Sequence, residues 1–451
     1  MPMTLGPRLA GTVQGAGKSS QPSQLSQPSL AVCLSAAADV VASVLGGHTP
    51  DAALQAIAAP VRPAAMDLAL SSLRAFGRGD FALQRLLERP LKDARVHGLL
   101  LVALARLEAR PEQAHTIVDQ AVAAVEKLAG GHFKGMVNGV LRSFERRREE
   151  LLGEADNNEV ARWLHPAWWI ARLKHDHPQM WQAILEAGNS RPPMSLRLNQ
   201  RRVPDAAARA SLLQQFDSAG IVVRESSHGA LELERPLPVE RLPGFAAGLC
   251  SVQDGGAQQA ATFLDCANDM RVLDACAAPG GKTAHLLERY DLDLLALDAD
   301  PTRAKRVTEN LNRLGLSARV VAEDCRDLSK WWDRRPFDRI LADVPCTASG
   351  VVRRHPDAKW LRRAGDVAQF ARTQAEILDS LWPTLAPGGK LLYVTCSVFA
   401  TENQDQVAAF IARHADAKAV ALPGAEQNVC QVQFLPDAAH DGFFYALLQR
   451  Q

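Results

Sequence analysis

The chain lacks an excess of charge of either sign, although it is 451 residues long. Lys and Arg together number 51, Asp and Glu number 50, and the formal net charge is +1. This balance provides no global field that would attract a polyanion, so a nucleic-acid site would have to be a local basic patch. At roughly 150 residues per domain, the length excludes a single small module and predicts two to four domains.

Long hydrophobic runs are also absent. No stretch reaches the roughly 18 consecutive apolar residues that a membrane span needs. Residues 1–29 are rich in Gly, Ser, Pro and Gln and have no compact apolar centre of the kind found in signal peptides. We therefore expect residues 1–29 to form a disordered tail, and we expect a cytoplasmic protein without a membrane partner.

The chain has eight cysteines but no Cys-x-x-Cys pair. This spacing argues against a zinc site, and without an export signal it also argues against a disulfide framework. We therefore expect reduced thiols and no metal. Any special role for a cysteine has to be argued from its neighbours in the sequence.

The pattern of apolar residues divides the rest of the chain into three predicted domains. Residues 30–165 repeat apolar positions every three to four residues between Gly and Pro breaks, which predicts an all-α helical bundle. Residues 166–242 combine a Trp-rich helix with short β-like runs, which predicts a small α+β connector. Residues 243–451 alternate strands rich in Val, Leu and Ile with helices, which predicts a Rossmann-like α/β domain with a doubly wound, mostly parallel sheet.

A glycine turn follows the first strand of this α/β domain. The run Asp274-Ala-Cys-Ala-Ala-Pro-Gly-Gly-Lys-Thr283 leads into a helix, a geometry that presents backbone N–H groups to a ligand. A phosphate-binding loop would need Gly five residues before Gly281, where Cys276 stands, and no GxGxxG dinucleotide motif occurs. The sequence therefore disfavours a nucleotide triphosphatase.

Acidic residues stand at the ends of four successive predicted strands, namely Asp274, Asp298, Asp324 and Asp343. In a doubly wound sheet, ligands bind outside the carboxyl ends of the strands, and an acid at the second strand can accept hydrogen bonds from ribose hydroxyls. Together these residues predict a pocket for a cofactor that contains a nucleoside.

Two cysteines complete the predicted pocket. Cys346 lies in Asp-Val-Pro-Cys, where Pro345 stiffens the turn, and Cys396 follows the strand KLLYVT. A lone cysteine is usually a small buried hydrophobe. Two cysteines at neighbouring strand ends, one of them close to an acid, indicate nucleophilic chemistry.

Five motifs together resemble those of the RNA 5-methylcytosine methyltransferases that use S-adenosylmethionine: DACAAPGGKT, DADPTRAKRVTENLNRLG, DVPCTASGVVRRHPDAKW, YVTCSVFATEN and DGFFYALLQ. The resemblance covers about residues 240–451. The run RRHPDAKWLRR, with LLERPLK and KGMVNGVLR upstream, is similar to bacterial members that methylate 16S rRNA and carry an N-terminal domain resembling the antitermination factor NusB.

The resemblance implies S-adenosylmethionine as methyl donor, no metal, and 16S rRNA or a small-subunit assembly intermediate as partner of a monomeric enzyme. Two alternatives stay open. The same chemistry could act on tRNA or 23S rRNA, or the chain could be a non-catalytic RNA-binding assembly factor.

The resemblance also implies the catalytic roles. Carbon 5 of cytosine accepts a methyl group only after a thiolate has added to C6, and the family assigns that thiolate to Cys396. Cys346 would help to expel the C5 proton or to release the enzyme, although DNA enzymes use the Pro-Cys cysteine and sequence logic alone would favour Cys346. Asp343 would bind N3 and the exocyclic amine of cytosine, and Lys282 is the fourth catalytic candidate.

For the cofactor, the resemblance implies that the glycine turn wraps the methionine end, that Asp298 holds the ribose and that Asp324 meets the adenine edge. Arg303 also matches the family pattern. The predicted cofactor residues are Cys276, Ala277, Ala278, Pro279, Gly280, Gly281, Lys282, Asp298, Arg303, Asp324 and Asp343.

A basic run follows the Asp-Val-Pro-Cys loop directly. A thiolate cannot reach a base inside a helix, so the target is a loop cytosine or an extruded one, and the RNA backbone must be held nearby. We expect these residues to form an exposed strip beside the active site that contacts RNA phosphates. They are Arg353, Arg354, Lys359, Arg362 and Arg363.

A second basic cluster, in residues 142–148, is interleaved with glutamates. We expect it to be a solvated helix with ion pairs between neighbouring turns rather than a nucleic-acid contact.

Overall fold

The structure is a computed structural model that describes residues 28–129, 131–226, 229–426 and 428–451. Residues 1–27 of the predicted tail lie outside the described residues. Within the described residues, no helix is long and apolar enough to cross a membrane.

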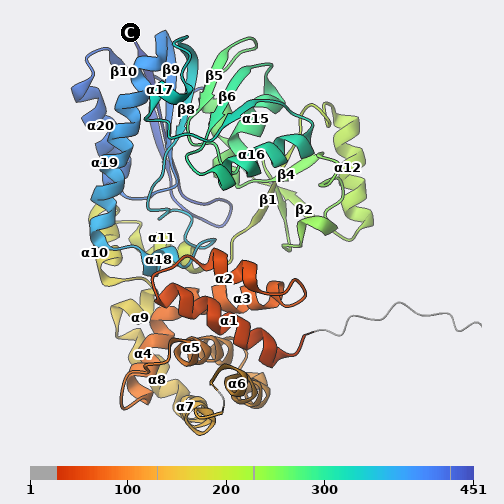
Figure 1. Cartoon of the computed structure of the whole chain (residues 1–451), viewed down its shortest axis with the longest axis vertical. Helices are drawn as coiled ribbons and strands as arrows, with labels where there is room; N and C mark the ends of the chain where they lie inside the picture. Colours follow the sequence, from red (N-terminus) through yellow and green to blue (C-terminus); the bar gives the residue numbers. More distant parts are fainter. Residues whose placement is uncertain (1–27, 130, 227–228, 427) are drawn as a thin grey trace, which may run out of the picture.

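Residues 30–163 form an all-α part, called the helical part below, which lies at the bottom of Figure 1. The all-α structure that the periodicity predicts for this stretch is present. The central α5 is buried along most of its length, and Gly98 allows close approach to α1, because a Cβ at Gly98 would lie 2.6 Å from the carbonyl oxygen of Ala38. The helices are α1 (Leu30–Leu45), α2 (Pro50–Ala56), α3 (Arg62–Arg74), α4 (Phe76–Leu86), α5 (Ala94–Ala109), α6 (Ala114–Ala129), α7 (Lys134–Arg146), α8 (Arg148–Asp156) and α9 (Glu159–Trp163).

The basic cluster of residues 142–148 lies on α7 and α8. Arg142 pairs with Glu145 at 3.0 Å and Arg147 pairs with Glu150 at 2.7 Å, both on the surface. The expected ion pairs between neighbouring turns are therefore present.

The next segment supplies a helix pair and a small antiparallel sheet. The sheet order is β2-β3-β1-β4, and β4 lies after residue 242, so the small sheet takes its last strand from beyond the predicted connector. The helix pair packs against the loop that contains Phe399, as the ring contact of Trp169 with Phe399 shows. The elements are α10 (Ala167–Asp176), α11 (Trp181–Asn189), β1 (Met194–Leu198), α12 (Ala206–Ser218), β2 (Val223–Glu225), β3 (Leu231–Leu233) and β4 (Cys250–Val252).

The remaining residues form the predicted doubly wound sheet, called the large sheet below, in the order β10-β12-β9-β8-β5-β6-β7, with β11 on β12. The five central strands are parallel, and β12 is antiparallel. The strands are β5 (Arg271–Asp274), β6 (Asp293–Leu297), β7 (Arg319–Val321), β8 (Phe337–Asp343), β9 (Leu385–Thr395), β10 (Ala417–Ala419), β11 (Gln431–Phe434) and β12 (Phe443–Arg450).

Helices cover both faces of the large sheet (Figure 1). The helices of this region are α13 (Gly255–Gln258), α14 (Ala260–Phe263), α15 (Gly281–Arg289), α16 (Pro301–Leu314), α17 (Leu328–Trp331), α19 (Ala364–Leu381) and α20 (Gln404–Arg413), together with the short α18 (Ala358–Leu361), which lies away from the sheet beside the helical part. The strand order reverses between β5 and β8, and ligands of such sheets bind at this switch point. The expected α/β fold class is confirmed.

The short helix α18 joins the large-sheet region to the helical part (Figure 1). The indole N–H of Trp360 donates to the carbonyl oxygen of Leu73 at 2.8 Å, and its ring lies 4.5 Å from the ring of Phe76. The guanidinium of Arg74 donates to the carbonyl oxygen of Arg353 at 2.7 Å. The segment that follows the Asp-Val-Pro-Cys loop is therefore anchored on α3 and α4.

Candidate active site

The two predicted catalytic cysteines meet at the ends of neighbouring strands β8 and β9. The sulfur atoms of Cys346 and Cys396 lie 3.3 Å apart, and Cys346 is buried whereas Cys396 is partly exposed. The hydrogen bond to Cys396 and burial raise the pKa of Cys346 well above its usual value. Cys346 therefore keeps its proton near neutral pH, and its sulfur lies in contact with the more accessible sulfur of Cys396.

Lys282 and Asp343 form an ion pair beside the cysteines. The Lys282 ammonium lies 2.6 Å from a carboxylate oxygen of Asp343, and both side chains are mostly buried. Burial alone would lower the pKa of Lys282, but the charge of Asp343 and the hydrogen bond to it raise that pKa above its usual value. Lys282 is therefore charged near neutral pH.

The glycine turn lies between β5 and α15. Gly280 has φ +93°, and a Cβ there would lie 3.1 Å from Val307 in α16, so only glycine fits without a shift. Asp274 accepts a hydrogen bond from the hydroxyl of Thr283 at 2.6 Å, and burial raises the pKa of Asp274 to about 7. The turn is thus held tightly against the end of the first parallel strand.

The predicted ribose acid, Asp298, follows β6 and is almost fully buried. Its carboxylate accepts hydrogen bonds from the backbone N–H groups of Ala278 at 3.2 Å and Asp300 at 3.1 Å. Arg303 lies 3.5 Å from this carboxylate and also donates to the carbonyl oxygen of Ala278 at 3.3 Å. The structure therefore brings Asp298, Arg303 and the glycine turn together.

Asp324, after β7, has a partner that the sequence reasoning missed. The guanidinium of Arg326 donates hydrogen bonds to the carboxylate of Asp324, with a shortest contact of 2.7 Å. This hydrogen bonding lowers the pKa of Asp324. The carboxylate is partly exposed and stays ionised, so it keeps free lone pairs for a further donor such as an exocyclic amine.

The predicted basic strip is not a continuous exposed surface, and this expectation is wrong for two of its residues. Arg353 is 1% exposed and Lys359 is fully buried. Arg353 pairs with Asp441 at 2.5 Å, and the ammonium of Lys359 donates to the side chain of Asn189 at 2.9 Å. Both side chains have partners inside the molecule, because buried polar groups need internal hydrogen bonds.

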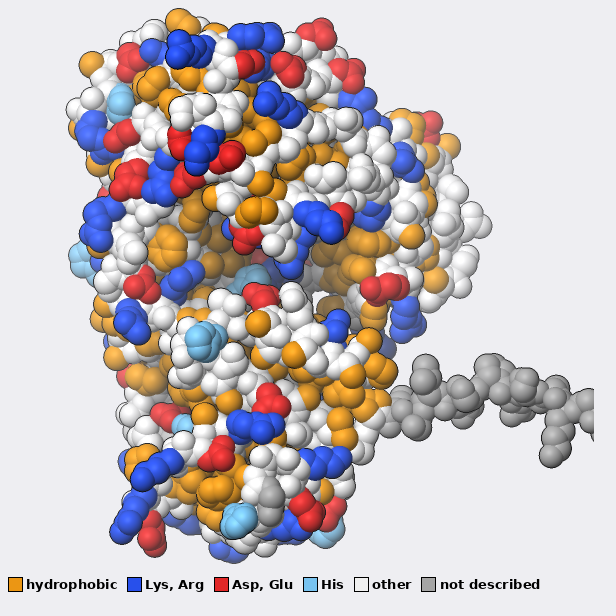
Figure 2. Space-filling model, viewed as in Figure 1, with side chains coloured by type: hydrophobic (Ala, Val, Ile, Leu, Met, Phe, Trp, Pro, Cys, Tyr) orange, Lys and Arg blue, Asp and Glu red, His pale blue; other side chains and the backbone are white. Residues whose placement is uncertain are grey.

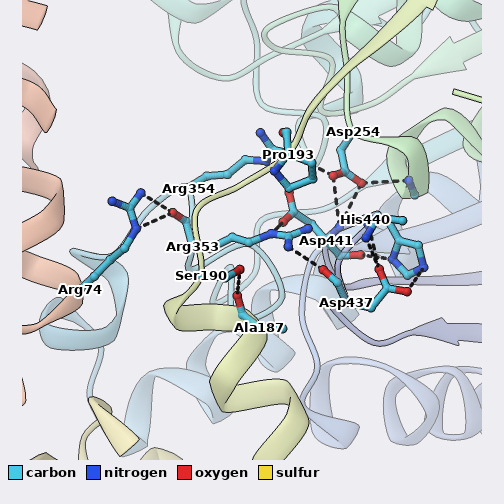
Figure 3. Close-up of polar contacts among 12 residues, drawn as sticks. Arg74, Ala187, Ser190, Pro193, Asp254, Arg353, Arg354, Asp437, His440 and Asp441 are labelled. Atoms are coloured by element: carbon cyan, nitrogen blue, oxygen red, sulfur yellow. Dashed lines mark hydrogen bonds and ion pairs between the residues drawn. The ribbon is translucent and has the colours of Figure 1, made fainter. Parts of the chain in front are cut away.

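The other members of the strip lie closer to the surface. Arg354 pairs with Asp441 and with Asp254, the latter at 2.9 Å (Figure 3). Arg362 is half-buried over the ring of Phe370, and Arg363 is exposed. Of the five, only Arg363 has the exposure that the sequence interpretation assumed.

The sequence reasoning also missed Glu402, a fully buried carboxylate beside both cysteine segments. Its only sequence signal is its place in the run FATEN, a few residues after Cys396.

The parallel sheet, the glycine turn at its switch point and the acids at its strand ends place the chain in the class of Rossmann-like methyltransferases. Known structures agree on the fold. The crystal structure of PH0851 matches with a TM-score of 0.76 over 93% of this chain and 99% of that chain, at 23% identity. The crystal structure of NSun6 from Pyrococcus horikoshii with SFG matches with a TM-score of 0.55 over 63% of this chain and 98% of that one, at 20% identity.

Sequence comparison gives the particular family. The profile described as 16S rRNA methyltransferase RsmB/F matches residues 261–449, an RsmF/B-like ferredoxin-like domain matches residues 165–240, and the NusB family matches residues 42–146.

Full-length relatives agree with these profiles. Ribosomal RNA small subunit methyltransferase B of Vibrio cholerae is 44% identical over 90% of this chain and 94% of its own length. The protein of that name from Salmonella newport is 43% identical over 85% of this chain and 89% of its own. The chain belongs to the RsmB/F family of 16S rRNA methyltransferases, and the expected family and NusB-like part are confirmed.

Proposed function

We propose that the chain transfers the methyl group of S-adenosylmethionine to carbon 5 of a cytosine in 16S rRNA. The observation that carries this proposal is the 3.3 Å contact between the sulfur atoms of Cys346 and Cys396, next to the Lys282–Asp343 pair. Family membership supports methyl transfer, and the names of the relatives support small-subunit rRNA as the substrate.

The first step is nucleophilic. The sulfur of Cys396 adds to C6 of cytosine, a covalent bond forms, and electron density moves to C5, which then takes the methyl group. The proton on C5 must leave before the Cys396–C6 bond breaks. Cys346, with its sulfur 3.3 Å from that of Cys396, is placed to assist this proton loss or the release of the enzyme.

Asp343 stabilises the charge that develops in the cytosine ring when C6 is attacked. Its carboxylate accepts a hydrogen bond from the exocyclic amine, and a second one from N3 once N3 has taken up a proton. Lys282 holds the carboxylate in place through its 2.6 Å contact. Cytosine, with an amine at C4, fits this acceptor better than uracil.

The donor set suits S-adenosylmethionine, which supplies an electrophilic methyl group when bound. The buried Asp298 and the neighbouring Arg303 stand where a ribose needs hydrogen-bonding partners, and the ionised Asp324 suits the adenine amine. The turn from Cys276 to Lys282 presents backbone groups to the methionine end.

RNA would approach from the side that carries α18 and α19. Figure 2 shows this face hollowed between the helical part and the large-sheet region, with basic and acidic side chains mixed over it. Arg363, together with the half-buried Arg362, is the part of the predicted strip that we propose as a phosphate contact.

The direct test is transfer of a labelled methyl group to 16S rRNA by the purified protein. We expect Cys396→Ala to abolish transfer, because no other thiol can form the C6 adduct. We expect Cys346→Ala to accumulate a covalent protein–RNA adduct, visible as a shifted band on a denaturing gel. The control is Cys430→Ala, a partly exposed cysteine outside the site, which should keep full activity.

Undiminished methylation by Cys396→Ala would overturn the assigned roles. The substrate is checked by bisulfite sequencing of total RNA from a deletion strain. Loss of one 5-methylcytosine in 16S rRNA supports the proposal, loss in tRNA or 23S rRNA moves the same chemistry to that molecule, and no loss contradicts it.

A further inference from the structure

One buried carboxylate contacts the segments that carry both cysteines. Glu402 is 0% exposed, and all of its hydrogen-bond donors come from the protein. One of its oxygens accepts from the backbone N–H of Thr347 at 2.9 Å and from the side chain of Gln374 at 3.1 Å. The other accepts from the hydroxyls of Thr347 and Ser397, both at 2.6 Å.

These four donors fill the roughly four acceptor positions of an ionised carboxylate. A carboxylate buried with full hydrogen bonding is a rigid connector, because loss of any one donor leaves an unsatisfied buried group. An amide at the same place would direct an N–H₂ group toward donors, so glutamine cannot reproduce the arrangement.

Two of the donors to Glu402 are direct chain neighbours of the cysteines. Thr347 follows Cys346 directly in the chain, and Ser397 follows Cys396 directly. Glu402 therefore ties together the two segments whose sulfur atoms lie 3.3 Å apart.

The neighbouring residue Asn403 supports only one side of this connection. Its side-chain N–H₂ donates to the carbonyl oxygen of Ser397 at 2.9 Å, and its carbonyl accepts from the hydroxyl of Thr395 at 2.6 Å. A backbone contact, from Gly350 N–H to the carbonyl oxygen of Cys396 at 2.8 Å, provides a second link between the loops.

The hydroxyl of Ser349 adds a third link, because it contacts the hydroxyl of Ser397 at 2.9 Å and accepts from the backbone N–H of Val398 at 2.8 Å. Glu402 differs from these links because it is a buried carboxylate that accepts from both Thr347 and Ser397.

We propose that Glu402 is a positioning residue that holds Cys346 in contact with Cys396. It touches neither reacting base nor methyl donor and acts through the two cysteines. Its effect on methyl transfer rests on the proposed function, whereas the contact between the sulfur atoms is a property of the protein alone.

The first test measures that contact without substrate. Diamide, a diazene oxidant, converts two thiols to a disulfide: each sulfur loses its proton and one electron, an S–S bond forms, and the N=N bond is reduced to a hydrazine. We expect the wild-type protein to form the Cys346–Cys396 disulfide, detected by peptide mass spectrometry. Glu402→Gln should form it at least about fivefold more slowly, since the two segments separate.

The control is Asp416→Asn, the same change of carboxylate to amide at a more exposed, hydrogen-bonded site near the opposite end of β9. Asp416 accepts hydrogen bonds from Trp382 at 2.9 Å and Arg450 at 3.1 Å. This variant should form the disulfide at the wild-type rate. If Glu402→Gln does not fold, Thr347→Val removes a single hydroxyl donor and should give an intermediate rate.

The second test is steady-state methylation. Because a misplaced catalytic group slows the chemical step, we expect Glu402→Gln to lower kcat about tenfold or more and to leave KM for S-adenosylmethionine and RNA within about twofold. A merely structural loss would instead lower the fraction of folded enzyme, which active-site titration measures.

The outcomes separate the two proposals. Equal disulfide rates in wild type and Glu402→Gln, or a folded wild type that forms no disulfide, overturns the role of Glu402. A slower disulfide in Glu402→Gln from a protein that methylates no RNA supports the positioning role and contradicts the proposed function.

Discussion

At the scale of single residues, two cysteines of one chain have different properties because their surroundings differ. Cys346 is buried, and its hydrogen bond with Cys396 together with burial raises the pKa of the Cys346 thiol. A buried thiol that keeps its proton is a poor nucleophile, whereas a partly exposed sulfur can be reached by a base. The proposal that Cys396 is the nucleophile agrees with these surroundings, although a choice from the residues alone would have favoured Cys346.

Substitution of Asp343 tests its role in the chemical step. Asp343→Asn keeps the shape of the side chain but removes the negative charge that pairs with Lys282 and that, in the proposed mechanism, stabilises the attacked ring. We expect kcat to fall by roughly 10²-fold or more while binding of S-adenosylmethionine is retained. Single-turnover methylation measures the first quantity and calorimetry measures the second.

A suitable comparison for that variant is Asp324→Asn, an acid on the predicted adenine side of the pocket. It should weaken cofactor binding and leave the single-turnover rate at saturating cofactor near the wild-type value. If Asp343→Asn transfers methyl groups at the wild-type rate, Asp343 has no part in the chemistry.

At the scale of elements, α18 determines how the catalytic loop is supported. The four residues of α18 are too few to form an independent helix, and their stability comes from tertiary contacts. Trp360 contributes its ring to Phe76 and its N–H to Leu73. The loop that carries Cys346 is therefore connected to the helical part through a short, packed segment.

Trp360→Ala tests this connection. Loss of the ring contact and of the 2.8 Å hydrogen bond should cost roughly 2 to 4 kcal/mol of docking free energy. We expect faster hydrogen exchange of backbone amides in α18 and at the end of α3, measured by mass spectrometry under native conditions, with the central strands of the large sheet unchanged.

Trp332 is a matched control for this experiment. It is also half-buried, and its indole N–H also donates to a backbone carbonyl at 2.8 Å, that of Arg335. Trp332→Ala should leave exchange in α18 at the wild-type rate. Unchanged exchange in Trp360→Ala would show that other contacts hold the two parts together.

At the scale of the whole molecule, a buried cation lies where three parts of the chain meet. The Lys359 ammonium, on α18, donates to Asn189 of α11 and lies 3.4 Å from the carbonyl oxygen of Arg74 in α3. Burial, assisted by the charge of Arg74, lowers the pKa of Lys359 to about 7. Packing of the parts against one another therefore disfavours the protonated form.

This shift makes global stability depend on pH. The unfolded chain holds the Lys359 proton up to about pH 10.4, whereas the folded chain loses it above about pH 7, so the unfolded state binds more protons in between. Stability from this group therefore rises with pH across that window, by up to about 1.4 kcal/mol per unit.

Lys359→Met should remove this contribution. The free energy of unfolding of the variant relative to wild type should fall steadily between pH 7 and 9, measured by denaturant titration. Lys305→Met is the control, because Lys305 is highly exposed on α16 and should give a difference that does not change with pH. A constant difference for Lys359→Met would contradict the lowered pKa.

Much of the fold and of the cofactor side of the site could be predicted from the sequence. The strand-end acids Asp298 and Asp343 and the turn before Thr283 are encoded locally, since each follows directly on an apolar strand. The parallel topology then brings such strand ends to one edge of the sheet. Arg326 follows Asp324 by only two residues, but no motif in the sequence marks it as the partner of that carboxylate.

The sequence by itself determined the class of the fold and the family, because strand periodicity and short motifs are local properties of the chain. Only the tertiary structure decided which charges face inward. Arg353 looks like a surface cation in the sequence, yet its partner Asp441 lies 88 residues away in the chain. Glu402 likewise gains its role from Thr347, 55 residues distant. Burial and pairing depend on contacts between distant segments, which neither composition nor spacing encodes.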